Sequence, residues 1–343
     1  MSLQVRSVRL GPVSFRARPR TWLVATLAWG IALVGAIAVL FSGSVNMTPE
    51  QFWAALAGVG ERADMLLLWE FRMPRAVTGL VVGACLGTAG CLFQALSRNA
   101  LGSPEIIGLT GGAALGAVAS VIVFRSFGWG TAVGAIIGCL GAALLTWVLS
   151  PRGFGGGNRL ILIGLGVASL IQPVTVLLLT RADSDSATSA RLWLTGTLNA
   201  RNWSHAVVSA VLFVVILPFA LLISRHLDAA APGEDLAAGL GVSRRFTQWT
   251  ATGVGVALTA AAVAVAGPIS FIALAGPHVT RRLLKGPTAP AGVAAGTGAA
   301  LLVAADLVGA NLPGGLQLPV GVTAGLLGGA YLLLLLNGQE RKK

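Results

Sequence analysis

The sequence has few charged residues for its length. Asp, Glu, Lys and Arg together make up 10% of the 343 residues, whereas soluble domains carry about 25%. Hydrophobic residues make up 55%, and the mean hydropathy is +0.82. This balance excludes an ordinary soluble protein and leaves no room for a sizeable soluble domain, so we expect an integral membrane protein.

The residues that common catalytic sites need are also scarce. The chain has three lysines, and Lys285 is followed by Gly286 rather than by the Ser or Thr of a P-loop. The sequence therefore excludes ATP hydrolysis by that route. The three histidines, His205, His226 and His278, lie far apart, which argues against a metal cage. Because the sequence offers no nucleophile–base constellation either, we expect neither an enzyme nor a bound cofactor or metal.

Cysteine is rare as well. All three cysteines, Cys85, Cys91 and Cys139, lie within apolar runs. Their spacing is typical of neither a disulfide framework nor a CxxC site. We interpret them as small buried hydrophobic residues, which is how free cysteine usually behaves.

Long apolar runs are what the sequence has in abundance. A membrane-spanning helix needs about 20 apolar residues, and most of the runs reach that length. The ten runs lie near residues 21–41, 76–97, 106–124, 128–149, 160–180, 206–224, 249–266, 268–280, 291–310 and 319–336. The run at 268–280 is short and predicts a stub or a steeply placed helix. The sequence therefore predicts an all-α polytopic membrane protein, with about ten transmembrane helices in one domain (21–337) between terminal segments 1–20 and 338–343.

Glycines recur within these runs at spacings of four residues. Small residues at this spacing let two helices approach closely. We therefore expect a compact multi-helix bundle rather than separate anchors. The clearest examples are Gly79–Gly83–Gly87, Gly112–Gly116 and Gly134–Gly138.

Basic residues are placed unevenly along the chain. The first twenty residues contain five arginines and no acidic residue. By the positive-inside rule this end is cytoplasmic. Alternating the spans then puts both termini and most of the 24 basic residues on the cytoplasmic side. Membrane topology therefore explains the net charge of +12, and nucleic acid is not an expected partner.

Two proline-containing motifs predict helix starts. Thr48-Pro49-Glu50-Gln51 offers an N-cap, a proline at the first helical position and a capping-box glutamine. It predicts a short helix over 49–58 on the outer side. Ser103-Pro104-Glu105 has the same pattern and predicts the start of the third span.

A polar island, residues 225–248, separates two apolar runs on the predicted cytoplasmic side. Glu234 and Asp235 follow a proline and a glycine, and acids at a helix N-terminus are favoured by the helix dipole. Gly239 and Gly241 can end that helix. The island therefore predicts a surface helix of about two turns where a soluble partner docks. In a chain without a P-loop, this indicates that the energy source is a separate subunit.

Three charged residues near the predicted outer face, Arg72, Arg75 and Asp306, each allow two interpretations. Arg72 and Arg75 flank Pro74. They are either ordinary interfacial charges or a docking patch for an acidic protein surface, because arginine binds carboxylates through a planar fork. Asp306 lies near the outer end of the ninth span, where a helix-end polar residue is favoured over a proton relay. The spans otherwise hold almost no ionisable residues, which argues against a stand-alone secondary transporter.

Motifs spread over residues 70–341 resemble those of one family. They are FRMPR (71–75), GLVVGACLGTAGCLFQALSRNALGSPEIIGLTGGAALGA (79–117), WLTGTLNARNW (193–203), GEDLAAGLGV (233–242), GPISFIALAGPHVTRRL (267–283) and LPVGVTAGLLGGAYLLLLL (318–336). In this order they are similar to the ferric-siderophore and vitamin B12 importer permeases, the type II ABC importer (FecCD) family. LLTRADSDSA (178–187) most resembles ferric-enterobactin permeases.

The resemblance implies a permease subunit of a ferric-siderophore importer in the bacterial inner membrane. It also implies a second permease subunit, two ATP-binding subunits that hold ATP and Mg²⁺, and a substrate-binding protein. This chain itself would bind no cofactor. Vitamin B12 or heme is an alternative cargo. A stand-alone secondary transporter and a non-transporting scaffold or receptor are alternatives of other classes.

The resemblance also implies roles for particular residues. Arg72 and Arg75 match the outward arginines that meet acidic residues of the binding protein, and Asn99 and Leu101 match the inner gate. One departure is that no arginine directly follows the segment 305–308 (ADLV). This favours a heterodimer in which a related permease supplies that charge. The helix that couples the permease to the ATPase is matched by Glu234, Asp235, Leu236, Ala238, Gly239 and Gly241.

Overall fold

The structure is a computed structural model, and it describes residues 6–10, 13–17, 19–43, 47–150, 158–231, 239, 241 and 243–340. Regular structure in this part of the chain is helical with one exception. Strands β1 (Arg6–Leu10) and β2 (Val13–Ala17) form an antiparallel hairpin in which Arg6 pairs with Ala17. The residue pattern of the N-terminal segment did not predict this hairpin.

Each of the ten predicted spans contains a helix. These are α1 (Pro19–Phe41), α4 (Met73–Ser97), α5 (Leu109–Ile122), α6 (Trp129–Leu149), α7 (Asn158–Arg181), α9 (Trp203–Ala230), α11 (Arg244–Ala266), α12 (Ile272–Leu284), α13 (Ala291–Ala310) and α14 (Val320–Glu340). Among the described residues, seven helices are long and apolar enough to cross a membrane, and α5 and the apolar part of α14 are shorter. Helix α12 has only 13 residues, as the short run predicted. The chain is thus a multi-pass, helical membrane protein.

Short helices occupy the polar segments between spans. Helix α2 (Pro49–Leu56) has the predicted capping box between Thr48 and Gln51. Helix α3 (Arg62–Leu66) and the π-helix η1 (Leu67–Arg72) continue directly into α4. The polar residues that precede the second apolar run are therefore helical from Arg62 onward. Helix α8 (Ser184–Leu194) forms in the polar segment between α7 and α9, and the 3-10 turn η3 (Pro313–Gly315) precedes α14.

Helix α4 forms the centre of the bundle. Of its most apolar stretch, 83% is buried, the largest share among the seven long helices. A methyl group on Gly87 would overlap the carbonyl oxygen of Ala294, and one on Gly83 would lie 2.6 Å from the carbonyl oxygen of Gly298. Backbone therefore contacts backbone between α4 and α13, which confirms the close approach predicted from the glycine spacing.

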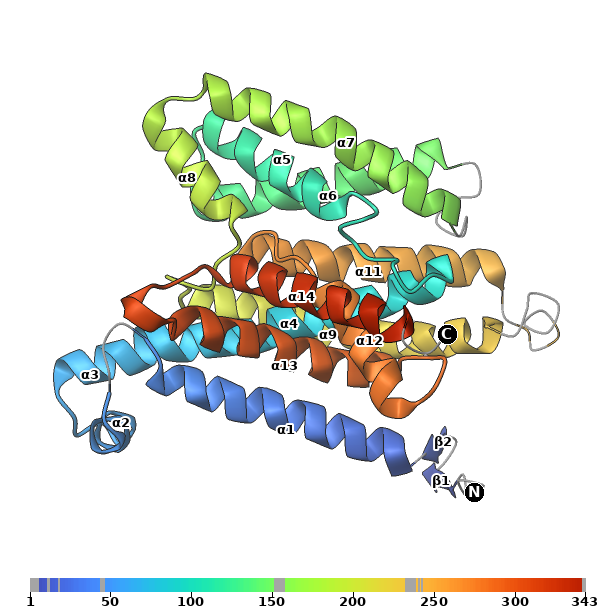
Figure 1. Cartoon of the computed structure of the whole chain (residues 1–343), viewed down its shortest axis with the longest axis horizontal. Helices are drawn as coiled ribbons and strands as arrows, with labels where there is room; N and C mark the ends of the chain where they lie inside the picture. Colours follow the sequence, from blue (N-terminus) through green and yellow to red (C-terminus); the bar gives the residue numbers. More distant parts are fainter. Residues whose placement is uncertain are drawn as a thin grey trace.

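The helices form two groups (Figure 1). Helices α5 to α8 lie together on one side, and α4, α9 and α11 to α14 form the main body with α1 along its far face. Helix α11 contacts both α6 and α4 and so joins the groups. The N-terminal hairpin and the end of α14 lie toward the end of the bundle where α9 ends and α11 begins, which we call the terminal end. Helices α2, α3 and α8 lie at the other end, which we call the α8 end.

Candidate functional site

An ion pair joins α4 to α13 near the α8 end. Arg75 Nε donates to Asp306 Oδ2 at 2.9 Å, and Nη2 donates to Oδ1 at 2.8 Å. The side chains are 18% and 5% exposed. An ionised group within a membrane-spanning segment is costly unless it is paired, so each residue explains the presence of the other. The sequence singles out both residues but does not indicate that they meet.

The side chain of Arg72 is buried in the described chain. It is 5% exposed, and its guanidinium Nη1 donates to the carbonyl oxygen of Leu40 at the end of α1. A role for Arg72 in docking a binding protein stays a prediction, and in this structure its side chain is buried against the end of α1. Arg72 is the last residue of the π-helix η1, which leads into α4. Docking through Arg75, which is partly exposed, stays a prediction.

Two tryptophans tie the short helices to the α8 end. The indole N–H of Trp203, at the start of α9, donates to the carbonyl oxygen of Trp69 in η1 at 2.8 Å. The indole of Trp69 in turn donates to the carbonyl oxygen of Ala55 in α2 at 3.3 Å. These contacts hold α2, η1 and α9 together, so the surface at this end is built from three separate segments of the chain.

Three of the matched motifs meet where α11 stops. The amide of Thr197 donates to the carbonyl oxygen of Ala266 at 2.8 Å, and the amide of Gly321 donates to Gly196 at 2.9 Å. Gly196 and Gly267 have φ angles of +67° and +76°, which favour glycine. The chain therefore breaks between α11 and α12, and buried partners satisfy the exposed backbone groups there, as a membrane-embedded break requires. The sequence signal was the set of glycines in WLTG, GPIS and LPVG.

The predicted gate residues lie in the connection between α4 and α5. Asn99 Oδ1 accepts the amide N–H of Leu101 at 2.8 Å, and the Leu101 side chain is 53% exposed. Arg98, which ends α4 with a φ of +51°, donates to the carbonyl oxygen of Ala230 at 3.4 Å. The structure thus links this connection to the end of α9. A gating role for Asn99 and Leu101 stays a prediction.

Glu105 has a partner that the sequence did not indicate. Its Oε1 accepts the amide N–H of Phe271, the N-cap residue of α12, at 2.8 Å. A carboxylate is favoured at a helix N-terminus. The predicted start of the third span at Ser103–Glu105 is therefore wrong, because α5 begins only at Leu109. Glu105 instead connects the gate segment to the helix break before α12.

Most of the predicted coupling helix lies outside the described residues. This holds for Glu234, Asp235, Leu236 and Ala238. Gly239 is exposed and helical, and Gly241 has a φ of +75°, which fits a helix-terminating glycine. Helix α9 extends to Ala230, past the predicted end of its apolar run. Its last turn therefore takes up the beginning of the predicted polar island.

The described residues offer no cluster of three or more His, Cys, Asp and Glu side chains that could hold a metal ion. The three cysteines are free and buried, as predicted. The thiol of Cys91 donates to the carbonyl oxygen of Ala289 at 2.7 Å, which shows one of them acting as a packing residue between helices.

Comparison with known proteins decides the family. The model of the FecCD transport family matches residues 31–337. The chain belongs to the FecCD transport family. The ferric enterobactin transport system permease protein FepG of Escherichia coli K12 is 39% identical over 326 residues, which cover 94% of this chain and 98% of FepG. The Fe(3+) dicitrate transport system permease protein FecD of the same organism is 35% identical over 278 residues, covering 79% of this chain and 85% of FecD.

The fold of this FecCD chain is similar to a solved one. A structure assigned as a metal-chelate type ABC transporter in an inward-facing conformation superposes with a TM-score of 0.80 at 25% sequence identity. The match covers 92% of this chain and 99% of the other. The shared architecture therefore extends over nearly the whole chain.

Proposed function

We propose that this FecCD chain is the permease subunit of an ATP-driven importer for ferric siderophores. The observation that carries the proposal is the similarity to FepG, which is named for ferric enterobactin transport and aligns over 94% of this chain at 39% identity. The sequence contains no P-loop, so the energy must come from other subunits. A siderophore already surrounds its iron, which fits a bundle whose described residues offer no metal cluster.

The proposed assembly has four further components. Two ATP-binding subunits hold ATP and Mg²⁺, a second and related permease subunit completes the path, and a substrate-binding protein delivers the cargo. The ATP-binding subunits dock at the terminal end, where α9 stops at Ala230 and α11 starts at Arg244. The segment between the end of α9 and the start of α11 includes the predicted coupling residues 234–241. The basic N-terminal segment and the positive-inside rule support a cytoplasmic location for this end.

The gate is proposed to lie in the 98–108 segment. Arg98 links it to the end of α9 at 3.4 Å, and Glu105 links it to the start of α12 at 2.8 Å. Movement of the coupling segment after α9 would therefore reach the gate through direct contacts. ATP binding would switch the bundle between outward and inward openings as rigid helices shift against one another. At the α8 end, Arg75 is the more exposed residue of the ion pair, at 18% against 5% for Asp306, and is the proposed contact for the binding protein.

Complementation in cells tests this function. A bacterial strain that lacks its own ferric enterobactin permease receives this chain with its neighbouring transporter genes, and uptake of ⁵⁵Fe-enterobactin is measured. We expect uptake that disappears when the ATP-binding subunit is inactivated. Uptake that survives this inactivation would support a stand-alone carrier. Restored uptake of vitamin B12 or heme, but not of any ferric siderophore, would contradict the proposed cargo.

A further inference from the structure

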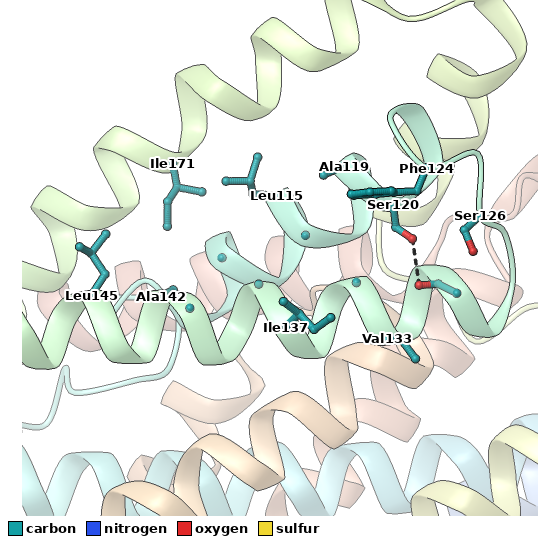
Figure 2. A pocket seen from close by; sticks show the side chains of 16 residues that line it. Leu115, Ala119, Ser120, Phe124, Ser126, Val133, Ile137, Ala142, Leu145 and Ile171 are labelled. Atoms are coloured by element: carbon teal, nitrogen blue, oxygen red, sulfur yellow. Dashed lines mark hydrogen bonds between the residues drawn. The ribbon is translucent and has the colours of Figure 1, made fainter.

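A cavity of about 680 Å³ lies between α5, α6 and α7. Figure 2 shows Leu115 and Ile171 on one wall and Ile137 on the other, with Phe124 at one end and Leu145 toward the other end. The side chains that line it are almost all apolar. The hydroxyl of Ser120, one of the two polar side chains there, already donates to the carbonyl oxygen of Gly130 at 2.9 Å.

Glycines create this cavity. Between α5 and α6, a methyl group on Gly138 would overlap the carbonyl oxygen of Gly112, and one on Gly116 would overlap that of Gly134. The two helices therefore touch backbone to backbone and leave a floor without side chains. Gly141 also lines the cavity, and nothing lies within 4 Å of the place where its Cβ would be. This glycine floor therefore leaves room in the cavity for an apolar ligand.

The cavity is elongated along α6 and opens on the outer surface of the bundle. Its lining runs from Gly130 to Leu145, which at the helical rise corresponds to about 22 Å. Val133 and Ile137 line it and are 54% and 64% exposed. In a multi-pass membrane protein, exposed apolar side chains within a span face lipid. The groove is thus long, apolar and parallel to a membrane-spanning helix, which is the shape of an acyl chain.

A basic residue lies next to one end of the groove in the sequence. Arg125 sits between the lining residues Phe124 and Ser126, and its side chain is 77% exposed. Its ion pair with Asp183 is 3.8 Å long and largely exposed, so it contributes little. The carboxylate of Asp183 is also the N-cap of α8 and accepts the amide N–H of Ser186 at 3.1 Å. Trp129, 43% exposed, begins α6 beside this end, as aromatic residues do at a membrane interface.

We propose that this groove binds a phospholipid, with one acyl chain along α6 and its phosphate on Arg125. The apolar cavity accounts for the acyl chain, and the arginine at its end accounts for the headgroup. The site does not depend on what the transporter carries. The bound lipid would hold α7 in position against the α5–α6 pair, because Ile171 of α7 forms part of the cavity wall.

Photo-crosslinking tests the site. The full chain is reconstituted in nanodiscs containing phosphatidylglycerol with a diazirine in the middle of one acyl chain, and labelled peptides are mapped after irradiation. We expect labelling of the peptides that line the groove to exceed labelling of the exposed helix α1. In Gly141→Leu, which fills the groove, we expect this excess to disappear. Gly30→Leu, on α1 and also with nothing within 4 Å of its Cβ position, is the matched control and leaves the excess unchanged.

A separate variant tests the contact between Arg125 and the lipid headgroup. Arg125→Gln should weaken binding of phosphatidylglycerol about fivefold in a native mass spectrometry titration, the factor expected for one arginine near an anionic lipid surface. Arg62→Gln, at an exposed arginine of α3, is the control and should have no effect. Labelling of the wild-type groove no stronger than that of α1, or unchanged labelling in Gly141→Leu, would overturn the proposal. So would a groove that cross-links to a second permease chain in the assembled transporter instead of to lipid.

Discussion

Arg75 and Asp306 form a two-bond ion pair between α4 and α13, although 231 positions separate them in the sequence. Asp306 is nearly inaccessible and Arg75 only slightly exposed. The pair lies near the α8 end of the same two helices whose glycines pack backbone to backbone. The ion pair therefore holds the α4–α13 contact together at this end, and the glycines allow the close approach along the rest of the two helices.

Removing one partner of this pair should destabilise the fold. Asp306→Leu leaves the Arg75 guanidinium without a counter-charge, and we expect the free energy of unfolding to fall by about 3 kcal/mol, as for other broken buried pairs. The double variant Arg75→Met with Asp306→Leu removes both charges and should recover most of that loss. Thermal unfolding in detergent measures both. Equal stability of the wild-type protein and the single variant would contradict this role.

The α4–α13 contact should not tolerate a side chain at Gly87. A methyl group there would overlap the carbonyl oxygen of Ala294, so we expect Gly87→Ala to push the helices apart and to lower the yield of folded protein. Gly253→Ala is the matched control, because this helical glycine has nothing within 4 Å of its Cβ position. Size-exclusion chromatography of the two variants compares them. A Gly87→Ala protein that elutes and melts like the control would show that this contact is not tight.

The bond between Glu105 and Phe271 should protect the start of α12. In Glu105→Ala the Phe271 amide loses its acceptor, and an unmade buried hydrogen bond costs about 1–3 kcal/mol. We expect hydrogen exchange of the peptide around residues 268–275 to become about tenfold faster or more. Glu105→Gln keeps an acceptor oxygen at the same position and should exchange much more slowly than the alanine variant. Identical exchange in all three proteins would mean that Glu105 does not hold this helix start.

Coupling through residues 234–241 should depend on the backbone conformation of this segment rather than on its side-chain packing. Gly239 is helical, exposed and has open space around its Cβ position. Proline there removes an amide N–H and disrupts the helix, so we expect Gly239→Pro to uncouple ATP hydrolysis from transport without unfolding the bundle. Gly239→Ala fits the same space and should behave like wild type. The measurement is ATPase activity of the assembled transporter with and without cargo-loaded binding protein. A proline variant that is stimulated normally would count against the coupling assignment.

The sequence predicted the features that depend on neighbouring residues. Apolar runs located the helices of all ten predicted spans, and the capping motif at Thr48 located α2. Four-residue glycine spacings predicted close helix packing, although not that α4 packs on α13 and α5 on α6. These signals are local because hydrophobic length and helix caps are properties of short segments.

The features it missed depend on contacts between distant segments. The pairing of Arg75 with Asp306 and of Glu105 with Phe271 follows only once α4, α12 and α13 are packed together. The sequence also gives no sign that the Arg72 guanidinium donates to the carbonyl oxygen of Leu40 at the end of α1. No pattern within one segment encodes such a contact.

Transport by the purified system tests the central proposal most directly. The chain is reconstituted in liposomes with its partner permease and ATP-binding subunits, its binding protein is added outside, and ⁵⁵Fe-siderophore accumulation is followed with ATP enclosed in the lumen. We expect accumulation that requires ATP, the binding protein and the ATP-binding subunits together. Accumulation by liposomes that contain this chain alone, without ATP, would contradict the account.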